Sequence, residues 1–503
     1  MAKEGESAMG GFFGVASKED CVLDLFFGTD YHSHLGTHRG GMAFWDGEKF
    51  IRYIHDISNS PFRTRFENDF ANCLTNDKLK SGIGSISDTD DQPLLFYSHL
   101  GKFALMTVGL ITNLDEIIKE FLSDNTYHFA AMQSGEITPT EVVGALINSQ
   151  DSFVEGIKNV QKRIKGSCSL LILTDKGEIY AARDYYGRTP VIIGKKDDSY
   201  AVTIESSAFL TLGYEHVKDL GPGEIVCISN NNCTTLAEPQ YEKMAICSFF
   251  YVYYGFPAST YEGINVEESR YRNGAQLAEA SCVPADIVAG IPDSGVSHAL
   301  GFADQSKIRY ARPFIKYTPT WARSFTPTRQ SMRKHIAKMK LLAIKELIKD
   351  KSIIFCDDSI VRGTQLMDQM AIIRKAEARE VHMRIACPPL LYPCKFLNFS
   401  SSRSVLDLAT RRVIKQFEGD NADISKYRDP DGAPYKNMVD ILCEQFKLDS
   451  LAFQRLDDFK KALGLKGICT FCWNGEDVSM PHECPHGCHS CSHTEGCMPP
   501  EKK

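Results

Sequence analysis

The chain has 503 residues, of which 43% are hydrophobic, and a formal net charge of −7. This length is enough for two or three domains with buried cores. With no basic block to neutralise phosphates, non-specific nucleic-acid binding is excluded. Apolar runs such as Phe103–Ile111 are too short to span a membrane, and the N-terminus lacks the apolar stretch of a secretory signal. We therefore expect a cytoplasmic protein.

The N-terminal region, from Gly10 to about Pro239, alternates short β-branched stretches with turn residues, which predicts strands. Helical segments are expected at Glu116–Leu122 and Thr140–Asn148, so we predict an α/β layered domain. The strands are expected within five segments: SLLILTD, EIYAARD, VIIGKK, YAVTIES and EIVCIS.

From about Cys247 to Cys443 the pattern becomes strand and helix in alternation, which is typical of a doubly wound parallel sheet. A short helical tail is expected at Leu451–Leu465. The predicted division is a leader-like segment at 1–9, domains at 10–240 and 241–450, and a helix with a cysteine-rich tail at 451–503.

The stretch Lys351–Leu366 is the most informative part of this second region. An apolar run, Ile353–Cys356, predicts a buried strand, and it is followed by two carboxylates and a short loop. A helical pattern begins after Thr364, so the loop leads into a helix N-terminus, where free N–H groups favour anions. Acidic residues beside a phosphate cradle suit a sugar phosphate and a divalent cation. The alternative is an ordinary turn with two solvated aspartates.

This order of strand, acidic pair, Ser-x-x-Arg-Gly-Thr and helix resembles the signature loop of the type I phosphoribosyltransferases, which bind phosphoribosyl pyrophosphate (PRPP). The resemblance implies that the loop amides hold the 5′-phosphate and that the acidic pair meets the ribose hydroxyls. The loop residues concerned are Asp357, Asp358, Ser359, Ile360, Val361, Arg362, Gly363 and Thr364.

Ala285–Ala303 also reads as strand, loop and helix, and the resemblance places Asp293 and Ser294 at the pyrophosphate. It implies a magnesium ion held by Ser294, Asp357 and Asp358. Taken alone, the loop that contains Asp293 and Ser294 could be a surface turn. Between the two loops, the family has a flexible segment that closes over PRPP, and Lys316, Arg323 and Arg333 match its basic positions. A solvated basic face is the alternative for each of them.

The first region resembles the N-terminal-nucleophile glutaminase domain, of αββα architecture, found in glutamine PRPP amidotransferases. Together with the second region, the resemblance covers nearly the whole chain. The matching phrases are Gly10–Val15, Thr37–Lys49, Gln92–Phe96, Leu110–Ile117, Arg183–Lys195 and Leu220–Ile228.

The groups that hydrolyse glutamine in that family are missing from this sequence. Gly10 stands where the family has its N-terminal cysteine nucleophile. Ser87 replaces an arginine, Val108 replaces the asparagine of the oxyanion hole, and Pro139 replaces the aspartate that holds the substrate's amino group. We therefore expect a glutaminase fold without glutaminase activity; a shifted alignment register is the competing explanation. Phe256–Ser259 also lacks the arginine and aspartate of a family motif near the domain interface, which implies that the coupling between the two sites has been lost.

Six of the 17 cysteines lie in the last 35 residues, which predicts metal binding there. The family resemblance implies a [4Fe–4S] cluster on Cys247, Cys394, Cys469 and Cys472, although the Cys-x-x-Cys pair alone would also suit zinc or redox chemistry. In the tail, Cys484, Cys488, Cys491 and Cys497 suit a zinc site, a second cluster or an unstructured thiol-rich segment.

The resemblance implies an enzyme that forms 5-phosphoribosylamine from PRPP in purine biosynthesis, using ammonia from solution or from a separate glutaminase. Two alternatives stay open. One is a non-catalytic PRPP- or nucleotide-binding regulator of an active paralogue, and the other is a phosphoribosyltransferase that uses another nucleophile. The family also implies purine nucleotide ligands and a homodimer or homotetramer.

Overall fold

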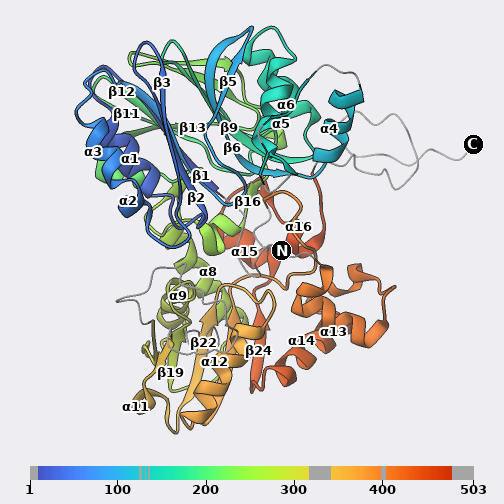
Figure 1. Cartoon of the computed structure of the whole chain (residues 1–503). Coiled ribbons are helices and arrows are strands. Elements are labelled where there is room, and N and C mark those ends of the chain that lie inside the picture. Colours follow the sequence, from blue (N-terminus) through green and yellow to red (C-terminus); the bar gives the residue numbers. More distant parts are fainter. Residues whose placement is uncertain are drawn as a thin grey trace, which may run out of the picture.

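A computed structural model describes residues 10–397, with gaps at 124–126, 131, 134–135 and 317–340, and residues 404–478. The N-terminal part is built on two antiparallel sheets that pack face to face (Figure 1). The first sheet runs, in spatial order, β13 (Glu215–Asp219), β11 (Ile192–Lys196), β12 (Ser199–Thr203), β1 (Gly10–Ser17), β4 (Ser81–Ser87), β2 (Arg39–Trp45) and β3 (Phe50–Asp56). The second runs β15 (Cys233–Ala237), β14 (Ile225–Ile228), β10 (Ile179–Ala182), β9 (Gly166–Thr174), β6 (Gly101–Ile111) and β5 (Leu94–Ser98).

Helices cover the outer face of each sheet, so the domain has the predicted αββα layers (Figure 1). Both expected helices are confirmed, because Leu114–Ser123 and Pro139–Asn148 contain them. The helices on the first sheet are α1 (Val22–Asp30), α2 (Phe62–Arg65) and α3 (Glu67–Cys73); those on the second are α4 (Leu114–Ser123), α5 (Pro139–Asn148) and α6 (Phe153–Arg163).

The C-terminal part contains a four-stranded parallel sheet in the order β19 (Ile287–Gly290), β22 (Ser352–Asp357), β23 (Glu380–Ile385) and β24 (Ser450–Phe453). Both faces are buried, as the continuous apolar pattern of β22 requires. Ile353 and Phe355 pack with α12 (Thr364–Lys375), whereas Ile354 and Cys356 pack with two helices on the other face. Those two are α8 (Val266–Ser281) and α9 (Val296–Ser306).

The helical tail expected at Leu451–Leu465 is wrong in its first part. Ser450–Phe453 forms β24, and the helix α15 begins only at Leu456 and ends at Leu463. The strand is four residues long and runs directly into the helix, so its period could not be separated from the helical one. The remaining α-helices are α7 (Ser207–Leu212), α11 (Lys345–Ile348), α13 (Ala409–Glu418), α14 (Ala433–Gln445) and α16 (Phe471–Asn474). Among the described residues, no helix is long and apolar enough to cross a membrane.

Helices α8 and α9 approach each other closely enough for their backbones to touch. A Cβ on Gly301 would lie 2.0 Å from the carbonyl oxygen of Tyr271, and a Cβ on Gly274 would lie 2.0 Å from that of His298. Glycine is therefore required at both positions, and this contact holds α9 against the sheet where the Asp293 loop ends.

We expect Gly301→Ala to lower the free energy of unfolding by about 1–3 kcal/mol, because the added carbon overpacks a backbone contact. Urea denaturation would measure the change. Ala280→Ser, which adds one atom on the exposed side of α8, is the matched control and should cost a few tenths of a kcal/mol. An equal loss in both variants would contradict this account of the helix pair.

Candidate functional site

The predicted phosphate loop lies at the carboxyl edge of the parallel sheet. Strand β22 ends at Asp357, and α12 begins at Thr364. In the intervening loop, the N–H groups of Ser359, Ile360, Val361 and Gly363 donate to no other described residue. A row of such donors ahead of a twelve-residue helix is a suitable anion site.

Gly363 closes this loop in a left-handed conformation with φ of +75°. A Cβ there would also lie 2.6 Å from the ring of Phe446. The carbonyl of Val361 accepts a hydrogen bond of 2.8 Å from the Ala409 amide, and Arg412 donates to the carbonyl of Arg362. The loop is thus held from behind by α13 and α14, which leaves its amides unengaged.

The environment of the acidic pair, Asp357 and Asp358, favours a bound cation. Burial, followed by the charge of Asp358, raises the pKa of Asp357 well above its ordinary value, while a hydrogen bond from Ser294 opposes the increase. Asp358 is itself buried, and it accepts a hydrogen bond of 2.6 Å from the Ser359 hydroxyl. The structure therefore brings Ser294, Asp357 and Asp358 together.

The neighbouring loop reaches the same edge because β19 pairs in parallel with β22 and places Gly290 beside Cys356. The Ile291 amide donates to the Cys356 carbonyl at 2.9 Å. Lys316 Nζ lies 2.7 Å from Asp293 Oδ2, so two predicted pyrophosphate residues are paired. Arg323 and Arg333 lie outside the described residues, as do Cys484, Cys488, Cys491 and Cys497.

The four positions singled out in the N-terminal domain line one cavity. Gly10 lies opposite Ser87 across β1 and β4, and Val108 and Pro139 close the cavity from β6 and α5. Its volume is about 20 Å³, which is space for about one water molecule and not for an amino acid. A Cβ on Gly10 would lie 2.5 Å from the Ile86 carbonyl oxygen, so a side chain here would require the backbone to shift. The sequence reasoning did not find Ser167 and Cys168, which also line it.

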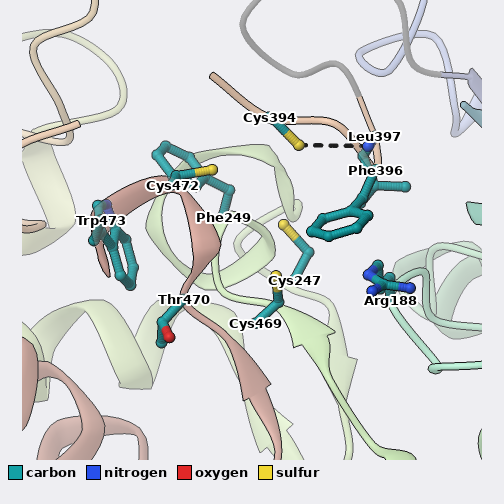
Figure 2. A pocket seen from close by; sticks show the side chains of 10 residues that line it. All are labelled: Arg188, Cys247, Phe249, Cys394, Phe396, Leu397, Cys469, Thr470, Cys472 and Trp473. Carbon is teal, nitrogen blue, oxygen red and sulfur yellow. Dashed lines mark hydrogen bonds between the residues drawn. The ribbon is translucent and has the colours of Figure 1, made fainter. Parts of the chain in front are cut away.

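The four predicted cluster cysteines also converge, on a second cavity of about 10 Å³ (Figure 2). Cys247 and Cys469 are paired across the short parallel strands β16 (Ile246–Cys247) and β25 (Ile468–Cys469). Cys472 lies in α16, and Cys394 comes from an irregular segment whose sulfur accepts the Leu397 amide at 3.4 Å. None of the four is in a disulfide.

Three of the four thiols around this cavity have raised pKa values and so resist ionisation. Burial raises the pKa of Cys247 well above its ordinary value and that of Cys469 to about 11, and for Cys472 the hydrogen bond with Cys394 is the largest cause of the increase. Among the described residues, no group of three or more His, Cys, Asp or Glu side chains is arranged to hold a metal ion. Sequence reasoning also missed Arg188, which lines this cavity; the only signal was its place inside the matching phrase Arg183–Lys195.

The domains meet around a buried carboxylate. Glu205 accepts hydrogen bonds from His34 at 3.0 Å, from the Phe256 amide at 3.4 Å and from the Ser259 hydroxyl. Although Phe256–Ser259 lacks the family's arginine and aspartate, the segment still contacts the first domain. Arg183 and Glu262 form a further ion pair across the boundary, at 2.6 Å.

The layered N-terminal domain, followed by a parallel sheet with a phosphate loop, defines an amidotransferase fused to a phosphoribosyltransferase. A family model of the glutamine amidotransferase domain matches residues 80–211. Over 488 residues the chain is 31% identical to the amidophosphoribosyltransferase of Methanocaldococcus jannaschii, covering 93% of this chain and 97% of that protein. It is 29% identical over 496 residues to the amidophosphoribosyltransferase of Bacillus subtilis, covering 94% and 96%. The chain therefore belongs to the amidophosphoribosyltransferase family.

Solved structures agree with this assignment. The glutamine PRPP amidotransferase of B. subtilis, complexed with ADP and GMP, superposes with a TM-score of 0.77 at 28% identity, covering 95% of this chain and 99% of that one. A structure described as the allosteric regulatory enzyme of purine biosynthesis superposes with a TM-score of 0.78, also at 28% identity, covering 95% and 98%.

We expect Gly363→Ala to destabilise the protein by about 1–2 kcal/mol through the left-handed backbone alone, and by more because of the contact with Phe446. The double variant Gly363→Ala/Phe446→Leu tests this division, since it relieves the contact but not the backbone strain. In thermal denaturation, Gly363→Ala should lower the stability of the Phe446→Leu variant by less than it lowers the stability of the wild type. An equal cost in both backgrounds would show that the ring is not involved.

Proposed function

We propose that the protein binds PRPP with magnesium and forms 5-phosphoribosylamine with free ammonia, without hydrolysing glutamine. The observation that carries this proposal is the contrast between the two sites. The phosphate loop keeps its donors and its acidic pair. The cavity at Gly10 has no side chain at the family's nucleophile position, the pKa of its one thiol, Cys168, is raised by burial, and its volume is only about 20 Å³. The names of the relatives support the transferase half of the proposal.

In the proposed reaction the nitrogen of ammonia attacks C1 of the ribose, the bond from C1 to the pyrophosphate oxygen breaks, and pyrophosphate leaves with the electron pair. The attacking nitrogen then loses a proton to solvent. The loop from Ser359 to Gly363 would hold the 5′-phosphate through its amides. Asp357 and Asp358 would accept hydrogen bonds from the ribose hydroxyls, and Lys316 would donate to pyrophosphate oxygens. These residues position the reactants and offset charge, and they form no covalent intermediate.

The donor set fits magnesium, which binds carboxylate and hydroxyl oxygens and typically keeps phosphate and water as its other ligands. Ser294, Asp357 and Asp358 are the residues that would hold it. When bound, the ion neutralises charge that develops on the leaving pyrophosphate. The raised pKa of Asp357 supports this assignment, because a cation beside this carboxyl group would favour its ionised form.

The four thiols fit a [4Fe–4S] cluster, for which Cys247, Cys394, Cys469 and Cys472 would be the ligands. The chemistry of the donor set supports this: four cysteines that are in no disulfide, from three distant segments, line one cavity, and no carboxylate or histidine is among its lining residues. The cavity of about 10 Å³ is smaller than a cluster, so the thiols must part to admit one. Cys394, which lies outside any helix or strand, is the ligand best placed to move.

The central test is turnover with ammonium against turnover with glutamine. We expect pyrophosphate release from PRPP with ammonium chloride and magnesium, and no glutamate formation from glutamine. Gly10→Cys should not restore glutamine hydrolysis, because the new side chain collides with Ile86 and three other positions are still changed. Protein prepared without oxygen would be assayed for both products. PRPP binding without turnover, with ammonium or any other amine, would instead support a regulatory protein.

The acidic pair gives a second prediction. Asp357→Asn and Asp358→Asn should each weaken PRPP binding at least about tenfold, because hydrogen bonds to charged groups contribute about 1.5–3 kcal/mol and about 1.4 kcal/mol corresponds to tenfold. Magnesium affinity of the wild type should increase with pH, since the ion competes with the proton that Asp357 retains. Isothermal titration calorimetry at several pH values would measure both. Asp368→Asn, exposed on α12, is the matched control and should leave both affinities unchanged.

A further inference from the structure

Arg188 is a buried cation whose hydrogen-bonding capacity is largely unused. Its side chain is about 1% exposed, and Nη1 donates to the Gly166 carbonyl at 3.3 Å. Nε and Nη2 have no hydrogen-bond partner among the residues that the structure describes. The nearest carboxylates, Asp184 at 3.9 Å and Asp477 at 3.8 Å, are beyond hydrogen-bonding distance. Leaving donors of a buried charge unsatisfied is costly, so an additional acceptor is required.

Two aromatic rings support the guanidinium without satisfying these donors. Its central carbon lies 3.8 Å from the ring centre of Phe396 and 4.5 Å from that of Tyr186. Stacking uses the face of the guanidinium plane and fixes its orientation. The N–H groups point along the edge of that plane, where a stacked ring cannot accept them.

Arg188 lies beside the four-cysteine cavity (Figure 2). Its own backbone carbonyl accepts a hydrogen bond of 3.0 Å from the Cys247 amide, which fixes the arginine next to that ligand position. The unsatisfied donors of Arg188 and the four thiols are therefore parts of one site.

We propose that Arg188 is a positioning residue for the cluster, donating hydrogen bonds from Nε and Nη2 to sulfur and compensating the negative charge of the four thiolates. This inference rests on the proposed cluster. One-electron reduction adds negative charge to the cluster, so a fixed cation beside it favours the reduced form and raises the reduction potential. Hydrogen bonds to sulfur would also slow the loss of ligands to oxygen or a chelator.

The test uses the full-length protein, loaded without oxygen with ferrous iron and sulfide. Wild type, Arg188→Met and Arg188→Lys would be compared by iron and sulfide content, by a redox titration followed by electron paramagnetic resonance, and by the rate of bleaching in air. In Arg188→Met we expect the ratio of reduced to oxidised cluster at a fixed potential to fall about tenfold, which is equivalent to about 59 mV for a one-electron couple, together with several-fold faster bleaching.

Arg188→Lys retains the charge but not the planar pair of donors. It should therefore keep most of the reduction potential while bleaching faster than the wild type. Lys466→Gln is the matched control, because Lys466 is exposed and lies three positions before Cys469 in the sequence. Removing this solvent-screened charge should leave the potential and the bleaching rate unchanged. Thermal denaturation of each variant shows whether it is folded. If Arg188→Met is not folded, the comparison of Arg188→Lys with the wild type decides the question.

The outcomes separate the two proposals. A wild type that takes up no cluster overturns both the cluster and the role of Arg188. A wild type that takes up a cluster, with a folded Arg188 variant of unchanged potential and unchanged bleaching rate, overturns only the role of Arg188. Equal effects of the Arg188 and Lys466 substitutions would also overturn it, since the effect would then reflect general charge.

Discussion

The structure depends on the hydrogen bonding of one short strand, β16, which links the two domains. On one side, the Ala245 and Cys247 amides donate to the carbonyls of Tyr186 and Arg188 in the first domain, at 2.8 and 3.0 Å. On the other side, β16 pairs in parallel with β25 near the end of the described chain, and the Ser248 hydroxyl donates to the Cys469 carbonyl at 2.6 Å. Three distant parts of the sequence are therefore fixed at one point. The four thiols and Arg188 are found at this junction.

The sites of the two domains differ, although both domains keep the folds of their relatives. In the parallel sheet, backbone donors and acidic side chains are left available at the strand ends, which is the common position for ligands in open α/β sheets. In the N-terminal domain, the cavity at Gly10 has a volume of only about 20 Å³. A side chain at Gly10 would collide with the Ile86 carbonyl, so the backbone as well as the lining side chains limits this space.

Much of the fold could be predicted from the sequence, because strands such as Ser352–Asp357 and helices such as Pro139–Asn148 carry clear periodicity. The convergence of Gly10, Ser87, Val108 and Pro139, and that of the four cysteines, followed from a family resemblance; spacing alone would not have given it. Strand β24 was missed because four residues carry too little pattern. Arg188 could not be assigned a role from the sequence, because its unsatisfied hydrogen-bond donors become visible only when its neighbours are placed in space. Some of these neighbours, such as Phe396 and Asp477, lie more than 200 positions away in the sequence.

The glycine at position 10 has a practical consequence for work with inhibitors. Electrophilic analogues of glutamine act on glutaminases of this architecture by alkylating the nucleophile, and a glycine offers such a reagent no atom to modify. Under the proposed function, treating this protein with such a reagent leaves position 10 unmodified and leaves the formation of phosphoribosylamine from ammonium salts unchanged.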